Sequence, residues 1–279
     1  MSSNKVWYVT GASQGLGLSL VKQLLSAGYR VAATSRSTAG LENAVGAVNG
    51  DQFLPLEVDL TSPDAIRASI EQTVAAFGTV DVIVNNAGYG MEGTVEELEE
   101  EKVRAIFEIN VFATINVTKY ALPYLRKQRS GHIINISSVA GFVGAPGWSI
   151  YSATKSAVIA FSEVLALDVQ ELGIKVTVIG PSGFRTGFLT KGSLVSVESR
   201  ISDYQSVTRT RARYAAMDGN QDGDPEKAAA LFIQLAEIPD PPLHLWLGAN
   251  AFARASEKIG SMGKEIKKWK DLSLSADFK

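Results

Sequence analysis

Short apolar segments rich in β-branched residues recur along the chain and are separated by stretches of helical periodicity. We expect seven strands, at residues 6–10, 30–34, 53–58, 80–84, 132–136, 175–179 and 243–247. Most of these segments are apolar throughout, as in strands that are covered on both faces of a sheet. The sequence therefore predicts an α/β fold, a doubly wound parallel sheet of about seven strands with helices on both faces.

Length and composition narrow the classes of function. A chain of 279 residues with 46% hydrophobic and 20% charged residues can form one large domain, which we expect to span 1–279. A net charge of −2 without a broad basic region disfavours a nucleic-acid partner. The absence of cysteine, with only His132 and His244, disfavours a metal centre and a Ser-His-Asp triad. No segment is suited to membrane insertion or secretion, so we expect a cytoplasmic protein.

A tyrosine and a lysine lie one helical turn apart, and a serine pair precedes them. Tyr151 and Lys155 are separated by four residues, and Ser138 lies thirteen residues before the tyrosine. On a helix the two side chains leave the same face, and we expect the positive charge to lower the pKa of the phenol from its free value of about 10. Such a phenol exchanges protons with a carbonyl oxygen. The alternative is a chance pairing on a helix face.

A glycine-rich turn follows the first predicted strand and precedes an apolar-periodic helix. It reads Thr-Gly-Ala-Ser-Gln-Gly-Leu-Gly over residues 10–17. Glycines at such a junction allow a tight turn, close approach to a pyrophosphate and close packing of the helix on the sheet. The turn therefore predicts a Rossmann-type dinucleotide site, although a turn alone would also explain the glycines.

The segment after the second predicted strand indicates which dinucleotide binds. An NAD site is expected to carry a carboxylate about twenty residues beyond the glycines, whereas this chain has Ser35 and Arg36. A guanidinium beside a hydroxyl suits a 2′-phosphate by charge and by forked hydrogen bonding. We therefore expect NADP(H), with Glu42 as the nearest acidic residue in sequence. The alternative is an ordinary loop arginine.

These motifs together resemble the short-chain dehydrogenase/reductase family, in its compact branch without a separate substrate domain. The resemblance runs from residue 6 to about 186. Within the family, the chain is similar to 17β-hydroxysteroid dehydrogenase-like members. It rests on the glycine turn, Asp59, the run Asn-Asn-Ala-Gly at 85–88, Asn110, Ser138, Tyr151 and Lys155, in the family's order.

The resemblance implies a role for each matched residue. Tyr151 would be the general acid and base, Lys155 would hold the nicotinamide ribose, Ser138 would bind the substrate oxygen, and Asn110 would organise a water relay. A nicotinamide would supply the hydride. The expected cofactor-binding residues are Gly11, Ser13, Gln14, Gly15, Leu16, Gly17, Ser35, Arg36, Asp59, Leu60, Asn86, Ala87, Gly88, Tyr151, Lys155, Pro181, Gly183 and Thr186.

Two of these residues have simpler explanations, and a third position departs from the family. Asn110 would also serve as a buried amide that satisfies backbone groups, and Ser138 as a turn residue. Ser182 stands where the family commonly has glycine, so we expect a displaced or restricted turn there.

Apolar and aromatic residues near the motifs predict the substrate. The expected pocket walls are Tyr89, Val143, Trp148, Phe184, Phe188 and Leu189. Such walls suit a bulky hydrophobic ketone or alcohol, although core or lid packing is the alternative. The polar stretch 187–224 is expected to form a substrate lid, whose Arg209, Arg211 and Arg213 would either meet an anionic substrate or line a solvated face.

The helix expected after Tyr151 is apolar on nearly every side over residues 157–172. Such a helix has to be covered all round, by the fold or by a second subunit, and we expect a homodimer or homotetramer. Two other functions remain open: a nucleotide-sugar epimerase or dehydratase, and an NADP(H)-sensing regulator without turnover. The first normally needs a larger C-terminal domain, and the second does not need Ser138, Tyr151 and Lys155 together.

Overall fold

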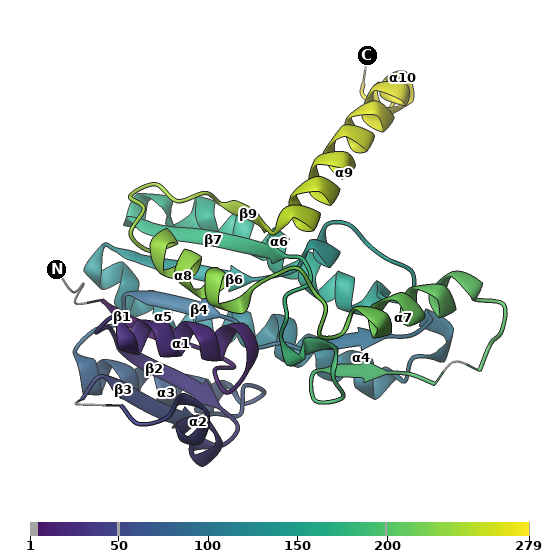
Figure 1. The fold of residues 1–279 in the computed structure, drawn as a ribbon. Helices are drawn as coiled ribbons and strands as arrows, with labels where there is room; N and C mark the ends of the chain where they lie inside the picture. The colour runs from purple at the N-terminus through teal and green to yellow at the C-terminus, as the bar shows by residue number, and fades with distance from the viewer. Residues whose placement is uncertain (1–4, 49–50, 199, 279) are drawn as a thin grey trace.

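The centre of the computed structural model is a seven-stranded sheet in which every strand is parallel (Figure 1). The structure describes residues 5–48, 51–198 and 200–278, so the N-terminal residues 1–4 lie outside it. The strands, in their order across the sheet, are β3 (Phe53–Glu57), β2 (Arg30–Ser35), β1 (Val6–Val9), β4 (Val82–Asn85), β6 (Gly131–Ile136), β7 (Ile174–Pro181) and β9 (His244–Leu247). All seven predicted strands are confirmed, with ends shifted by at most two residues.

Helices cover both faces of this sheet and enclose two apolar layers. One layer packs the sheet against α1 (Gly15–Ser26), α2 (Thr38–Val45) and α8 (Pro225–Leu235), through buried residues such as Leu20 and Phe232. The other packs it against α3 (Pro63–Phe77), α5 (Ala113–Gln128) and α6 (Ser149–Val169), through residues such as Ile70 and Leu165. The predicted doubly wound, Rossmann-type architecture is confirmed.

Local sequence signals fix where these helices begin and end. Ser62 accepts a hydrogen bond from the backbone N–H of Ala65 at 3.2 Å, Pro63 occupies the first turn, and Gly78 ends α3 with φ +81°. Asp224 and Pro225 start α8 in the same way. These signals set both ends of α3 and the start of α8.

The strand order places a ligand crevice at one point of the sheet. From β1 the chain builds outward to β2 and β3 on one side and to β4, β6, β7 and β9 on the other. Ligands of open α/β sheets bind beyond the carboxyl ends of the strands where the order reverses. Here that point lies between β1 and β4, next to the glycine turn and the Asn-Asn-Ala-Gly run.

A second, two-stranded parallel sheet lies outside the main one and was missed by the sequence. It pairs β5 (Gly90–Glu92) with β8 (Leu194–Ser196). Three-residue strands are too short to show a periodic pattern. The sheet joins the segment after β4 to the predicted lid segment 187–224, which also contains α7 (Gln205–Met217) and in which residue 199 lies outside the described ranges.

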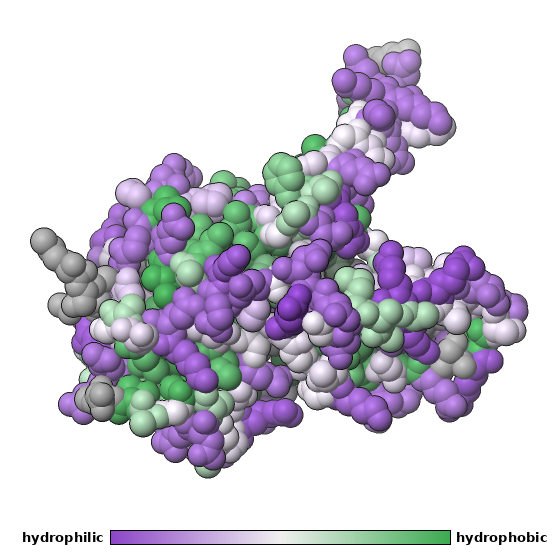
Figure 2. All heavy atoms as spheres, viewed as in Figure 1, coloured by the Kyte–Doolittle hydropathy of each residue, from purple (hydrophilic) through white to green (hydrophobic). Residues whose placement is uncertain are grey.

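The C-terminal helices project away from the body of the molecule (Figure 1). The last long helix, α9 (Ala249–Lys268), continues into α10 (Lys270–Leu274). The face of this projection seen in Figure 2 is mainly hydrophilic.

The shorter helical elements lie between the strands and long helices. They are η1 (Val95–Glu97), α4 (Glu100–Phe107), the π-helical turn η2 (Glu108–Phe112), η3 (Val139–Gly141), η4 (Gln170–Leu172) and η5 (Gly187–Leu189).

One described helical stretch, Ser149–Leu172, is long and apolar enough to cross a bilayer by length and composition alone. A core helix of a globular protein meets the same criteria. This stretch contains α6, whose buried residues include Tyr151 and Lys155 and whose inner face packs on the sheet. Two large apolar side chains of α6, Val164 and Leu167, point outward and are 58% and 72% exposed.

Candidate active site

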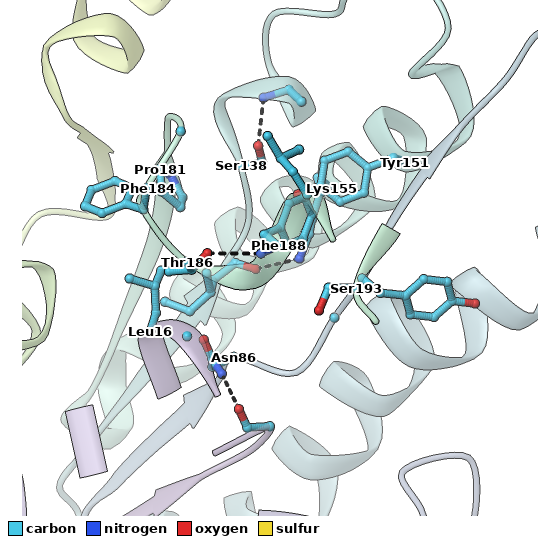
Figure 3. Close-up of a pocket in the computed structure, with 18 of the residues that line it drawn as sticks. Leu16, Asn86, Ser138, Tyr151, Lys155, Pro181, Phe184, Thr186, Phe188 and Ser193 are labelled. Carbon is cyan, nitrogen blue, oxygen red and sulfur yellow. Dashed lines mark hydrogen bonds between the residues drawn. The ribbon is translucent and has the colours of Figure 1, made fainter. Parts of the chain in front are cut away.

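A cavity of about 1070 Å³ lies at the carboxyl ends of the central strands. Residues that follow β1, β2, β3, β4, β6 and β7 line it, together with residues of α6, the 187–224 segment and the start of α9 (Figure 3). The structure brings all the sequence-predicted site residues to this cavity except Gly17 and Asn110, which stand behind its wall. Residues distant in sequence therefore converge as the parallel-sheet argument requires.

The glycine turn is held by an amide from the neighbouring strand end. The Asn86 Nδ2 group donates to the carbonyl oxygens of Thr10 and Gly11 at 2.9 and 3.0 Å. A Cβ on Gly17 would lie 2.5 Å from that Nδ2 and 2.6 Å from the Gly11 oxygen. Gly11 and Gly15 adopt φ +65° and +56°, which disfavour other side chains. This geometry fits a turn that receives a pyrophosphate (Figure 3).

The segment after β2 presents Arg36 to the same cavity. Arg36 is exposed, and the structure shows no ion pair between it and another described residue. Glu57 lies beside Ser35 across the β2–β3 pair and accepts a hydrogen bond from Thr38 Oγ1 at 3.4 Å. The sequence placed the nearest acidic residue at Glu42. Strand pairing brings Glu57 to this end of the cavity, which linear spacing could not show.

Asp59 occupies the loop after β3, as the resemblance implied. Its Oδ1 accepts hydrogen bonds from the backbone N–H and the hydroxyl of Thr61 at 2.9 and 2.7 Å. These hydrogen bonds hold the pKa of the Asp59 carboxyl below its ordinary value. The carboxylate therefore stays charged at the edge of the cavity.

Tyr151, Lys155 and Ser138 gather on one wall of the cavity (Figure 3). Tyr151 and Lys155 are 5% and 4% exposed on α6. The Lys155 ammonium donates a hydrogen bond to the Ile136 carbonyl at 2.9 Å. The backbone carbonyl of Lys155 accepts one from the Ser137 hydroxyl at 2.8 Å. Ser138 caps η3 by accepting from the Ala140 N–H at 3.1 Å. The end of β6 and the first turns of α6 thus position all three groups.

The expected lowering of the Tyr151 pKa does not occur in this structure. Burial raises the pKa of Tyr151 above its ordinary value, and an interaction with the Ser138 side chain opposes that rise. The Lys155 nitrogen lies 5.9 Å from the centre of the Tyr151 ring and bonds to a carbonyl instead. Burial also lowers the pKa of Lys155 to about 8. Helical spacing predicted the shared face correctly, but it says nothing of desolvation, which dominates here.

Asn110 acts on the backbone in this structure. Its Nδ2 donates to the Tyr89 carbonyl at 3.0 Å and to Thr154 Oγ1 at 3.1 Å, and its Oδ1 accepts from the Tyr89 N–H at 3.0 Å. Asn110 lies in the π-helical turn η2, a local widening of the helix often found at functional sites. These contacts match the simpler of the two sequence interpretations, in which Asn110 is a buried amide that satisfies backbone groups. The water relay stays a prediction.

The turn after β7 is not strained by Ser182. Among the described residues, Arg129 is the one non-glycine residue with positive φ, so Ser182 has an ordinary backbone conformation. Its hydroxyl donates to the Leu247 carbonyl at 3.4 Å, which ties the turn to β9. Ser182 thus needs no positive φ here, and a displacement of this turn relative to the family stays a prediction. Thr186 still reaches the cavity and accepts from the Phe188 N–H at 3.3 Å.

Aromatic rings form the wall beside Tyr151. Ring centres of Trp148 and Phe188 lie 5.5 and 5.7 Å from that of Tyr151, and Tyr214 lies 4.9 Å from Trp148. Tyr89, Val143, Phe184 and Leu189 also line the cavity, as the sequence predicted.

The sequence missed several further lining residues. They lie on α7, on the segment after it and on the first turns of α9, and include Tyr214, Met217, Gln221, Asn250 and Arg254. Ser193 accepts a hydrogen bond from the Gln14 amide at 2.8 Å and so connects the glycine turn to the 187–224 segment. The three arginines in 209–213 were the one sequence signal that pointed to this region.

Comparisons with known proteins agree with this geometry. The family model described as short chain dehydrogenase matches residues 5–196. The oxidoreductase BOA17 of Botryotinia fuckeliana is 35% identical over 273 residues, covering 98% of this chain and 99% of the relative. A 3-ketodihydrosphingosine reductase of Bacteroides thetaiotaomicron is 35% identical over 240 residues, covering 86% of each chain.

A solved structure matches nearly the whole chain. The crystal structure of a short-chain dehydrogenase from Streptomyces avermitilis is 36% identical, has a TM-score of 0.91, and covers 99% of this chain and 100% of that one. Both the family model and relatives of similar length therefore match most or nearly all of the chain. The chain belongs to the short-chain dehydrogenase/reductase family of oxidoreductases.

Proposed function

We propose that this chain is an NADP(H)-dependent oxidoreductase that interconverts a bulky hydrophobic ketone and a secondary alcohol. The observation that carries the proposal is the convergence of Ser138, Tyr151 and Lys155 on one wall of a cavity that also contains the glycine turn. The nicotinamide would supply or accept the hydride. The chain's own groups would bind the cofactor, orient the carbonyl and move the proton.

Tyr151 is the proposed proton donor to the carbonyl oxygen in reduction. Its raised pKa keeps the phenol protonated at neutral pH, which suits an acid. Ser138 would donate a hydrogen bond to the same oxygen and stabilise the charge that develops there. Lys155, with a pKa of about 8, is mostly charged at neutral pH and would bind ribose hydroxyls beside Tyr151.

Asn110 is proposed as a positioning residue. By holding the backbone of Tyr89 it fixes the segment that follows the Asn-Asn-Ala-Gly run. A Cβ on Gly88 would lie 3.0 Å from Asn110 Oδ1 and 3.2 Å from the Lys155 nitrogen. This close contact shows how tightly the loop, the amide and the ammonium are assembled, and it supports a shared role in ordering the ammonium.

Arg36 supports the proposed preference for NADP(H). Its guanidinium lines the cavity beside Ser35 and is available to a 2′-phosphate. Arg36→Asp should weaken NADPH binding by on the order of a hundredfold, because it removes a charge-assisted contact and adds a like charge. NADH binding should change little. Arg67→Asp, at an exposed arginine of α3 outside the cavity, is the matched control.

The aromatic wall supports a hydrophobic substrate. Trp148, Phe188 and Tyr214 surround Tyr151 and would exclude water from the reacting carbonyl. The 187–224 segment, which contributes Phe188 and Tyr214 from different elements, is the proposed lid. A panel of aryl, steroid and long-chain ketones, followed by the loss of NADPH absorbance, tests the activity. Turnover confined to sugars or other highly polar carbonyls would refute the proposed substrate class.

Self-association and location complete the proposal. Val164 and Leu167 of α6 leave an apolar strip on the surface of the isolated chain. A second copy of the chain would cover it, so we propose a homodimer or homotetramer. Light scattering should give a molecular mass of at least twice the chain mass, and Leu167→Glu should lower this mass.

A cysteine-free chain also suits the reducing cytoplasm, which is the proposed location.

A further inference from the structure

Two helices add polar and cationic side chains to the lining of the cavity. The helix α7 contributes Arg213 and Tyr214, and the start of α9 contributes Asn250 and Arg254. The sequence left open whether the arginines of 209–213 meet a ligand or solvent. The structure separates them: Arg213 lines the cavity, whereas the Arg211 Nε atom pairs with Glu92 Oε1 at 3.2 Å and Arg209 is exposed elsewhere on α7.

Arg254 is already oriented by the fold. It is half-buried, and its Nη2 donates to the carbonyl of Val143, a residue of the predicted substrate wall, at 2.8 Å. Asn250 lies one helical turn before it on the same face of α9. A guanidinium fixed by one of its N–H groups keeps the others in a defined orientation for a planar anion.

The positive charge of Arg213 and Arg254 in the cavity is not compensated locally. The only carboxylate among the described lining residues is Asp59, an expected cofactor-binding residue that follows β3. No ion pair joins Arg213 or Arg254 to an acidic residue within the described ranges. Two cationic side chains that line the same cavity thus raise the local concentration of an anion.

A buried amide provides an independent sign that polar ligand atoms enter the cavity. Gln221 is 2% exposed and lines the cavity, and in the described part of the chain neither its Nε2 nor its Oε1 has a hydrogen-bond partner. Its Cγ lies 3.4 Å from where a Cβ of Gly183 would be. Leaving such a group unpaired is costly, so a polar atom of a bound molecule is its natural partner.

We propose that the substrate carries an anionic group of the carboxylate class at the end remote from the reacting carbonyl, bound between Arg213 and Arg254. The identity of the reacting end rests on the proposed function. The aromatic residues Trp148, Phe188 and Tyr214 line the same cavity and suit an apolar spacer between the carbonyl and the anionic group. The substrate class is therefore a keto acid with a hydrophobic middle, and a cationic amphiphile is disfavoured.

Binding tests the anion site without turnover. Calorimetric titration of the protein saturated with NADPH would compare decanoate, decanol and decylamine, which share an apolar chain. Decanoate should bind about tenfold more tightly than decanol, a difference of about 1.4 kcal/mol, and decylamine should bind most weakly. The double variant Arg213→Met/Arg254→Met should remove the preference. Arg209→Met, an exposed arginine of the same helix outside the cavity, should retain it.

Kinetics separates failure of this proposal from failure of the proposed reductase. The substrate pair is the keto acid with a methyl ketone at the far end of the same chain, and its methyl ester. A lower KM for the acid than for the ester in the wild type, lost in the double variant and retained in Arg209→Met, supports the anion site. Turnover of both compounds without preference overturns the anion site and leaves the reductase standing. Selective decanoate binding without turnover of any ketone overturns the reductase alone. Equal binding of decanoate and decanol overturns the anion site.

Discussion

Replacing Gly17 with alanine tests how the fold prepares the cofactor turn. The added methyl group would lie 2.5 Å from Asn86 Nδ2 and 2.6 Å from the Gly11 carbonyl oxygen. Either the amide moves and loses its bonds to Thr10 and Gly11, at about 1 kcal/mol each, or the turn is forced apart. Overpacking of this kind costs about 1–3 kcal/mol. We expect the free energy of unfolding to fall by about 2–4 kcal/mol.

Urea unfolding and NADPH titration measure the two consequences of this change. The displaced turn should raise the Kd for NADPH by at least about tenfold, because the backbone no longer follows the pyrophosphate. Asn86→Ala removes the same two bonds without inserting a methyl group, so it should lose about 2 kcal/mol of stability. Gly260→Ala, at a helical glycine with open space around its Cα, should be neutral or slightly stabilising. Wild-type stability and NADPH affinity in Gly17→Ala would refute the close-packing argument.

Two further predictions concern charge. Glu57→Gln removes the carboxylate beside Ser35 and should tighten NADPH binding several-fold relative to NADH; an unchanged ratio would show that Glu57 does not act on the 2′ position. Burial, with help from Lys5 and Lys175, lowers the pKa of His132 to about 4, so the folded chain keeps this histidine neutral while the unfolded chain binds a proton below about pH 6.5. Stability should therefore be complete above pH 6.5 and fall as the pH drops to 4, by about 3 kcal/mol from this group. His132→Gln should remove that component, so a difference between wild type and variant that stays constant with pH would contradict it.

The sequence predicted the sheet well because its signals are strong there. Continuous apolar segments such as 132–136 identify strands that are buried on both faces, and the helix caps at Ser62 and Asp224 are local. The site residues followed from the sheet, since the carboxyl ends of parallel strands share one edge. The glycine turn, Ser138 and Tyr151 could therefore be placed together before any coordinates.

What the sequence missed depends on contacts between distant segments. The β5–β8 pair, the place of Glu57 beside Ser35 and the contribution of Arg254 all arise from tertiary packing. The burial of Tyr151 and Lys155 also arises from tertiary packing. Their spacing in sequence shows that they share a helix face, whereas their burial decides their pKa values. The finer likeness to 17β-hydroxysteroid dehydrogenases stays a prediction.

The central claim is that the Tyr151 phenol transfers the proton while the cofactor and substrate are held by other groups. Tyr151→Phe keeps the ring that packs against Trp148 and Phe188 and removes only the hydroxyl. The rate of ketone reduction at saturating NADPH should fall by at least about a hundredfold, the lower range for a general acid, whereas the Kd for NADPH should change far less than the rate. Turnover at the wild-type rate in Tyr151→Phe would contradict the account.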